Sequence, residues 1–184
     1  ARRLLLLSRQ PLSTQAHQAI HSLIQQGAHV SHLCVDVADY ESLKNALLST
    51  QTDGTRPLGI IHCAGVLDDH LLMDMQWDNF KNVYASKVLG TINLDKLTRA
   101  FEVDCFVMFS SVASVLGNRG QANYAAANAF MDALAHQRKL IGLPALTINW
   151  GPWASLGMAQ SNAQISKHLS AQGFSTLGTE LALQ

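Results

Sequence analysis

The chain has 184 residues, 48% hydrophobic and 14% charged, so it can bury a sizeable core as one domain. Thirteen basic residues balance thirteen acidic ones, which argues against a global field steering the chain toward nucleic acid or an anionic membrane. Its longest apolar run is about strand length, well short of the ~20 residues that span a bilayer. Three widely spaced cysteines match no zinc or redox spacing, so we expect reduced thiols and a cytoplasmic protein without nucleic-acid or membrane partners.

The first third of the chain alternates between strand and helix patterns. Residues 2–8, "RRLLLLS", form a short apolar run bounded by polar residues and predict a buried strand. Ser13 and Thr14 are suitable helix-start residues, and the apolar positions after them share one helical face that ends at Gly27. Residues 29–37 then predict a second strand, and a second helix follows it around residues 40–47.

The same alternation continues to the end of the chain. Residues 58–65, "LGIIHCAG", predict a third strand, and a long helical region follows over about 78–101. Residues 105–111 predict a fourth strand, residues 121–141 a helix closed by Gly142, and residues 145–150 a fifth strand. Strands that alternate with helices predict an α/β domain with a doubly wound parallel sheet, helices on both faces and no internal domain boundary.

Ligands of such sheets bind beyond the carboxyl ends of the strands, and one segment there carries candidate chemistry. Ser111 ends the fourth strand, and Tyr124 and Asn128 lie one turn apart on the following helix. A tyrosine hydroxyl is a weak acid, but a nearby ammonium such as Lys87 would stabilise its phenolate. Together these side chains would suit proton donation to a carbonyl oxygen. Considered by spacing alone, however, a helical tyrosine is more often a core or rim aromatic.

Several longer segments resemble, in order and spacing, the ketoreductase domain of modular (type I) polyketide synthases, a branch of the short-chain dehydrogenase/reductases with a Rossmann-like fold. These segments are "HCAGVLDD", "ASKVLGTINL", "FVMFSSVASVLGNRGQANYAAANAFMDALA" and "GLPALTINWGPW". The likeness runs over nearly the whole chain. It implies NADPH-dependent reduction of a β-ketoacyl thioester that is tethered to an acyl carrier protein within a multidomain synthase.

The resemblance assigns four catalytic positions. It implies that Tyr124 is the general acid, that Ser111 hydrogen-bonds the β-keto oxygen, and that Lys87 holds the nicotinamide ribose and lowers the tyrosine pKa. The fourth position is Asn128, where ordinary short-chain reductases carry a lysine. This exchange of lysine and asparagine is typical of the polyketide branch and argues against a generic sugar or steroid dehydrogenase.

Cofactor contacts follow from the same resemblance. Ser8 and Arg9 match the segment that meets the 2′-phosphate of NADPH, and no acidic residue ends this strand to favour NAD. Asp36 and Val37 match the contact on the adenine side. Further cofactor positions fall in the segment along the adenosine ribose, at His62, Cys63, Ala64 and Gly65. Lys87 and Tyr124 are also implied to bind the cofactor, and residues 150–153, "WGPW", resemble the stretch beside the nicotinamide.

The resemblance also implies a stereochemical class. Leu67, Asp68 and Asp69 match the "LDD" signature of B-type domains, which give the D-configured β-hydroxy product. The tryptophan typical of the A-type, eight residues before the tyrosine, is Leu116 here. Two aspartates after a leucine could also simply cap the next helix. Met158, in a segment that resembles a lid over the substrate, is a candidate substrate contact.

One departure from the family is large. The family's first strand and its glycine-rich loop are not found in residues 1–184, so we expect the sheet to lack a central strand, with apolar surface exposed on its neighbours. Two other readings of function remain open. The chain could be a free-standing carbonyl reductase, or a reductively inactive domain that binds cofactor or serves as a structural or interaction module in a synthase.

Overall fold

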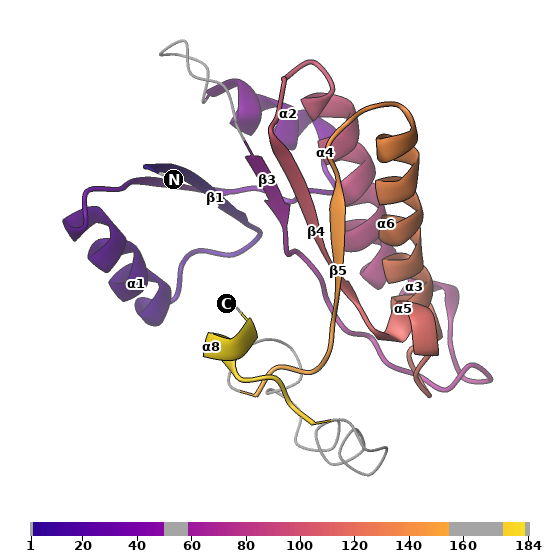
Figure 1. The fold of residues 1–184 in the computed structure, drawn as a ribbon. Helices are drawn as coiled ribbons and strands as arrows, with labels where there is room; N and C mark the ends of the chain where they lie inside the picture. The colour runs from indigo at the N-terminus through magenta and orange to yellow at the C-terminus, as the bar shows by residue number, and fades with distance from the viewer. Residues whose placement is uncertain (1, 50–58, 155–174, 183–184) are drawn as a thin grey trace.

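The computed structural model of the chain describes residues 2–49, 59–154 and 175–182 (Figure 1). Its elements confirm the predicted alternation. They are, in order, β1 (Arg3–Ser8), α1 (Thr14–Gln25), β2 (His29–Cys34), α2 (Tyr40–Ser49), β3 (Gly59–His62), α3 (Trp77–Tyr84), the π-helical turn η1 (Ala85–Leu89), α4 (Gly90–Thr98), β4 (Cys105–Ser111), α5 (Ala113–Leu116), α6 (Ala122–Leu140), β5 (Leu146–Trp150) and α8 (Thr179–Ala182).

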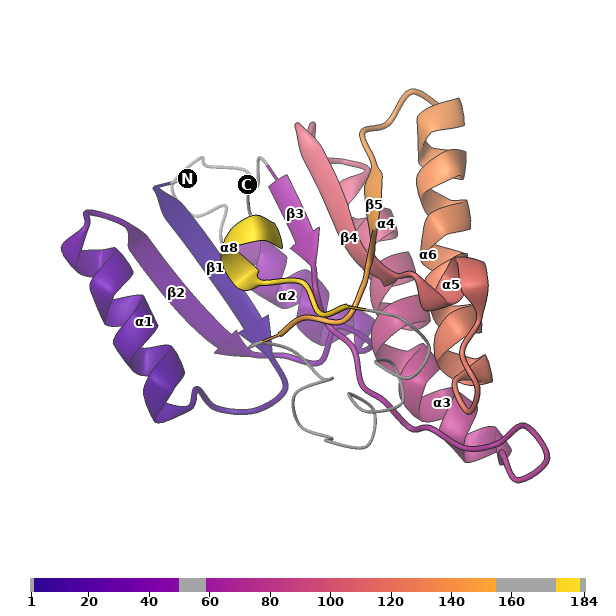
Figure 2. The same cartoon turned by 60° about the horizontal axis from the view of Figure 1, so that its bottom comes forward.

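All five strands pair in parallel, as predicted, but they form two sheets. One sheet has the order β1-β2 and the other β3-β4-β5. Figure 2 shows the strands in the order β2, β1, β3, β4, β5 across the molecule. The described part of the chain has no strand that pairs β1 with β3. The facing edges of these two strands are therefore where the expected central strand is missing.

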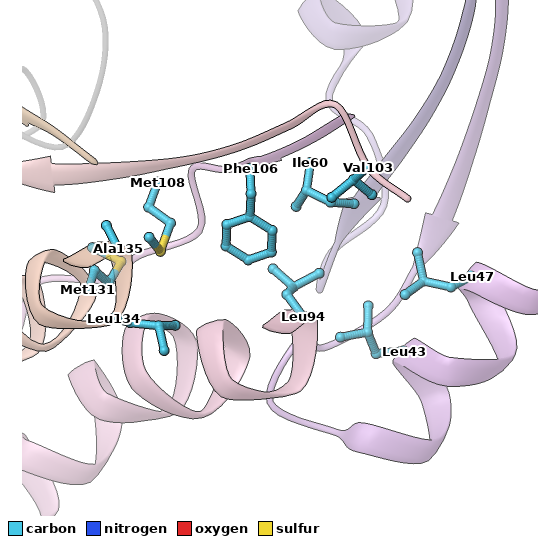
Figure 3. Close-up of a cluster of buried hydrophobic side chains, with 10 residues drawn as sticks. All are labelled: Leu43, Leu47, Ile60, Leu94, Val103, Phe106, Met108, Met131, Leu134 and Ala135. Carbon is cyan, nitrogen blue, oxygen red and sulfur yellow. The ribbon is translucent and has the colours of Figure 1, made fainter. Parts of the chain in front are cut away.

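Helices cover one face of the three-stranded sheet. Burial alternates along β4, and the side chains of Phe106, Met108 and Ser110 are buried on the face toward the helices. Figure 3 shows the resulting core between the sheet and helices α2, α4 and α6. Ile61, between two buried residues of β3, is 66% exposed. This agrees with the expectation of apolar surface exposed beside the missing strand.

Helices α1 and α2 have different neighbours. Helix α1 packs against β2, whereas α2 packs against α4. Figure 1 shows α1 and α2 on opposite sides of β1, which agrees with the predicted doubly wound arrangement. The glycines predicted to end helices α1 and α6 have the left-handed backbone that suits a helix end, with φ of 87° at Gly27 and 77° at Gly142. Within the described ranges, no helix combines the length and the apolar character needed to cross a bilayer.

A buried ion pair connects helices α4 and α6. The Arg138 side chain is 1% exposed, its Nη1 donates to Asp95 Oδ1, and its Nε donates to the carbonyl of Pro144 at 3.1 Å. Its guanidinium carbon lies 4.0 Å from the centroid of the Phe106 ring, close enough for a cation–π contact. The buried guanidinium is paired with a carboxylate and also binds a carbonyl and an aromatic ring. It therefore joins the two helices instead of disrupting the core.

Two elements were not predicted. The region 78–101 is helical, but the π turn η1 interrupts it between α3 and α4. The prediction treated this region as one regular helix, without the extra residue that a π turn adds. The segment between the predicted strand at 105–111 and the predicted helix at 121–141 contains the short helix α5 (Ala113–Leu116). Its backbone forms three hydrogen bonds of the helical kind, from Val115 and Leu116 to Val112 and from Gly117 to Ala113.

Candidate functional site

Three elements bring the predicted catalytic side chains together at the carboxyl end of β4. Lys87 comes from η1, Ser111 from the end of β4, and Tyr124 and Asn128 from the first turns of α6. Lys87 Nζ donates to the carbonyl of Phe109 at 3.0 Å and lies 5.2 Å from the centroid of the Tyr124 ring. The lysine is 2% exposed, so its ammonium is shielded from solvent beside the aromatic ring.

Small residues allow α6 to pack closely here. Ala127 is fully buried in an apolar cluster with Val83, Val88, Ala113 and Tyr124. On the same face, Asn128 Nδ2 donates to the Tyr124 carbonyl at 2.8 Å. The other amide atom, Asn128 Oδ1, is buried without a hydrogen-bond partner among the described residues. A buried acceptor left open in this way is a favourable place for a donor from a bound molecule or water.

The acidity of Tyr124 differs from the expectation. Burial raises the pKa of its phenol, hydrogen bonds from the side chains of Asn128 and Ser111 lower it, and the charge of Asp69 raises it again. The net direction is upward, because desolvation of a phenolate outweighs the stabilising contacts. Burial likewise lowers the pKa of Lys87 to about 8. The prediction that Lys87 lowers the tyrosine pKa is therefore wrong for the net shift in this structure.

The "LDD" loop lies against the turn that leads into Tyr124. Gln121 Nε2 donates to Asp69 Oδ2 at 2.8 Å, and the His70 amide donates to the Gly120 carbonyl at 2.9 Å. Leu67 packs against the apolar cluster that contains Tyr124. The loop is therefore attached directly to the start of α6, three residues before the phenol.

Asp68 holds this loop in shape. Its carboxylate accepts hydrogen bonds from Asn82, Asn79 and His70, and the first of these is the main reason that the pKa of Asp68 is lowered. The pKa of Asp69 is instead raised, mainly by burial. Leu116, at the end of α5, is 64% exposed. Met158 lies outside the described residues.

The predicted phosphate contacts lie on the other sheet. Ser8 Oγ donates to the Gln10 carbonyl at 2.6 Å and makes a second hydrogen bond, of 2.8 Å, with His32 Nε2. Arg9 is exposed. Asp36 lies two residues beyond the end of β2, and its carboxylate accepts a hydrogen bond from the Ala38 amide at 2.9 Å. These hydrogen bonds are made within the neighbourhood of β1 and β2 and do not involve Lys87 or Tyr124, so the part of Ser8, Arg9 and Asp36 in a shared site stays a prediction.

The other predicted cofactor residues approach the lysine. The carbonyl of Val37 accepts a hydrogen bond from Asn93 of α4 at 3.0 Å. His62 is buried, and its ring hydrogen-bonds the Ser86 carbonyl in η1. Burial raises the pKa of the Cys63 thiol, and the Lys87 charge opposes that shift. Ala64 and Gly65 continue this segment and are half-buried. The side chain of His62 is therefore engaged with η1, and its predicted part in binding a cofactor stays a prediction.

A group of polar residues beyond the predicted site supports the end of β4. Asp132 lies two helical turns after Tyr124, and its Oδ2 accepts hydrogen bonds from Ser114 Oγ at 2.6 Å and from Asn149 Nδ2 at 2.9 Å. These contacts anchor α5 directly after Ser111. Extending the four-residue spacing of Tyr124 and Asn128 by one more step would have indicated Asp132.

Acid should destabilise the fold through His62. Burial and the Lys87 charge lower its pKa from 6.5 to about 4, so below pH 6.5 the unfolded chain binds a proton that the folded chain does not. The stabilising effect of neutral His62 is complete above pH 6.5 and is lost as the pH falls toward 4. We expect this to lower the free energy of unfolding by about 3 kcal/mol. Denaturant titrations at pH 7 and pH 4 check the loss, which the His62→Gln variant should largely escape. An equal loss in that variant would contradict the assignment.

Comparison with known proteins gives a consistent result. Residues 1–155 match the family described as "KR domain". The chain is 39% identical to polyketide synthase GfsA of Streptomyces halstedii over 184 residues, which are all of this chain and 2% of that protein. It is 41% identical over 188 residues to pikromycin polyketide synthase component PikAII of Streptomyces venezuelae, covering 99% of this chain and 5% of that protein.

Solved structures agree with the fold. A structure described as an A-type ketoreductase from a modular polyketide synthase superimposes with a TM-score of 0.93 at 35% identity, covering 99% of this chain and 38% of that one. The first ketoreductase of the tylosin synthase superimposes with a TM-score of 0.90 at 36% identity, covering all of this chain and 39% of that one. The chain therefore spans less than half the length of these relatives.

Proposed function

Because this chain belongs to the KR domain family of modular polyketide synthases, with the short-chain dehydrogenase/reductase fold, we propose that it forms the catalytic part of an NADPH-dependent β-ketoacyl reductase. Its substrate is a β-ketoacyl thioester on an acyl carrier protein, and its product is the D-β-hydroxyacyl thioester formed during polyketide chain elongation. The observation that carries this proposal is the buried Lys87 ammonium beside the Tyr124 ring, at the strand end that also carries Ser111.

Each of the four proposed catalytic residues has a separate role in the reduction of the ketone. The Ser111 hydroxyl donates a hydrogen bond to the ketone oxygen and holds it near the phenol. Tyr124 gives its proton to that oxygen as the ketone becomes an alcohol, and the Lys87 ammonium stabilises the phenolate that remains. The raised pKa of Tyr124 keeps the phenol protonated before the reaction, which suits a general acid. Asn128 supports this arrangement by binding the Tyr124 carbonyl.

The donor set fits a nicotinamide dinucleotide phosphate. An ammonium carries three donors, and Lys87 uses one of them on the Phe109 carbonyl, so others can bind sugar hydroxyls. The exposed guanidinium of Arg9 fits a 2′-phosphate. Ser8 would contribute after its hydroxyl turns from Gln10 or His32. When bound, the cofactor supplies the reducing equivalents.

We further propose the B-type stereochemical class. The proposal is supported by the position of Leu67, Asp68 and Asp69, since this loop is hydrogen-bonded to the turn before Tyr124. A leucine stands where the A-type carries tryptophan. The similarity to a solved A-type structure is a similarity of fold and does not distinguish the two classes.

The remaining parts of the proposal concern the setting of the chain. The unpaired edges of β1 and β3 support the expectation that a further strand, with its glycine-rich loop, completes the domain. Because the relatives are parts of long synthases, the proposed partners are the acyl carrier protein and the other domains of one synthase. The free Cys34, Cys63 and Cys105 suit a cytoplasmic setting.

The two other readings of function receive less support. A free-standing carbonyl reductase would not need the exchange that places Asn128 after Tyr124 and the lysine on η1. A reductively inactive domain would have no reason to keep a buried, desolvated lysine beside a tyrosine, because burying that charge is costly.

One assay tests this proposal. The polypeptide that carries this chain is given a β-ketoacyl thioester with NADPH or NADH, and the product configuration is determined by chiral chromatography. We expect a D-configured product and a rate that is about tenfold or more higher with NADPH, because a charge-assisted phosphate contact contributes about 1.5–3 kcal/mol. Arg9→Ala, directly after β1, should reduce this preference, while Arg3→Ala at the start of β1 should not. No reduction with either cofactor would contradict the proposed function, and an L product would contradict the B-type class alone.

A further inference from the structure

The peptide groups on both sides of Lys87 are held by side chains. His62 Nε2 lies 3.1 Å from the Ser86 carbonyl, which precedes Lys87, and Thr91 Oγ1 donates to the carbonyl of Lys87 itself. In this turn the Gly90 amide donates to Ala85 five residues earlier, the spacing of a π helix. A π turn departs from the regular ladder of the helix, so contacts from outside the turn are needed to fix its carbonyls.

His62 is suited to hold such a carbonyl. It is 3% exposed at the end of β3, and burial together with the Lys87 charge keeps its pKa near 4, so it is neutral at physiological pH. A carbonyl can only accept, so Nε2 must carry the proton and donate it to Ser86. A neutral donor holds the backbone beside Lys87 without placing a second positive charge next to the ammonium.

The backbone at the end of the π turn packs closely against Val37 and His62. A Cβ added at Gly90, the residue after η1, would stand 2.6 Å from Val37 Cγ2 and 3.5 Å from His62 Cε1. The helix therefore approaches the strand ends as closely as a glycine allows. Ser86 is itself 5% exposed, so its carbonyl depends on the imidazole rather than on bulk water for this hydrogen bond.

We propose that His62 is a positioning residue for Lys87, whose imidazole N–H fixes the Ser86 carbonyl and so sets the direction in which the lysine leaves the π turn toward Tyr124. Lys87 reaches the Phe109 carbonyl and the phenol ring from this one backbone position. An error of about 1 Å in the placement of such a group can lower the rate about a hundredfold. This inference rests on the proposed function for its effect on the rate, but not for its effect on the lysine.

The test uses three variants of the polypeptide that carries this chain. His62→Leu removes the donor at similar volume, and His62→Gln places an amide N–H where Nε2 lies. Ile60→Val, two residues earlier in β3 and in the main core cluster, is the matched control for a loss of packing. The first readout is the pKa of Lys87, which is measured by an NMR pH titration of ¹³C-labelled lysine. The Lys87 signal is identified by its loss in Lys87→Arg. The second readout is kcat and KM for a β-ketoacyl thioester.

In His62→Leu we expect the pKa of Lys87 to rise from about 8 toward its ordinary 10.5, because a lysine that is no longer held regains water. We expect kcat to fall about tenfold or more, with KM for the thioester little changed. His62→Gln should restore both values, and Ile60→Val should change neither.

An unchanged Lys87 titration in folded His62→Leu would overturn the inference, whatever the activity. If His62→Leu does not fold, His62→Gln decides, since an altered Lys87 titration in that folded variant would overturn the inference and a retained one supports it. If the unmodified protein reduces no β-ketoacyl thioester, the proposed function fails, and the lysine titration still decides the role of His62.

Discussion

Replacing Tyr124 by phenylalanine is expected to lower the rate of β-ketoacyl thioester reduction by about 10²–10⁴-fold, the usual contribution of a positioned general acid. Phenylalanine keeps the ring against Val83, Val88 and Ala127, so the apolar cluster stays filled. It also keeps the ring 5.2 Å from Lys87, but it removes the only proton that the side chain can donate. KM for the thioester should change little, because the hydroxyl acts mainly in the transition state.

Tyr84→Phe is the matched control. Tyr84 ends α3 and packs against the same apolar cluster, so its replacement makes an equal chemical change nearby. We expect this control to keep nearly full activity. The measurement is cofactor oxidation at saturating thioester, with folding checked by circular dichroism. Full activity in Tyr124→Phe, or an equal loss in both variants, would show that the phenol of Tyr124 is not the acid.

Replacing Arg138 by methionine is expected to lower the free energy of unfolding by about 3–5 kcal/mol. The guanidinium is almost fully buried, and it holds Asp95 of α4, the Pro144 carbonyl and the face of Phe106 together. Methionine fills part of the volume but leaves the Asp95 carboxylate, which is 4% exposed, without its buried partner. A buried carboxylate left with only the half-exposed Arg99 as its cationic partner accounts for most of the expected loss.

Arg99→Met provides the comparison at the same carboxylate. Arg99 binds Asp95 Oδ2 at 2.7 Å, but its side chain is 48% exposed, so water can replace it. We expect this variant to lose less than about 1 kcal/mol. Denaturant titrations of both variants measure the difference. Equal losses would mean that burial of the ion pair does not determine its strength.

Several features of the protein could be predicted from the sequence because they depend on local pattern. Short apolar runs and helical periodicity located the five strands and the main helices, and Gly27 and Gly142 marked helix ends since only glycine adopts positive φ there at low cost. Alternation of strands and helices predicted parallel pairing. The gap between β1 and β3 in the described part of the chain was also predictable, because no segment of the sequence matched the family's first strand.

Other features depend on packing between distant segments, and the sequence did not indicate them. The π turn at Lys87 was not predicted, because the region 78–101 was treated as one regular helix. The contact of His62 with the Ser86 carbonyl joins residues 24 positions apart. The sign of the Tyr124 pKa shift was predicted incorrectly from a neighbouring charge alone, since burial depends on everything packed around the phenol.

The sequence by itself determined which residues could do the chemistry, because residue type and helical spacing place Tyr124 and Asn128 on one face without reference to the rest of the chain. Only the tertiary structure decided how those residues behave. Lys87, Ser111 and Tyr124 come from three separate elements, and their distances, burial and acidity are set by the packing of α6 against β4 and η1.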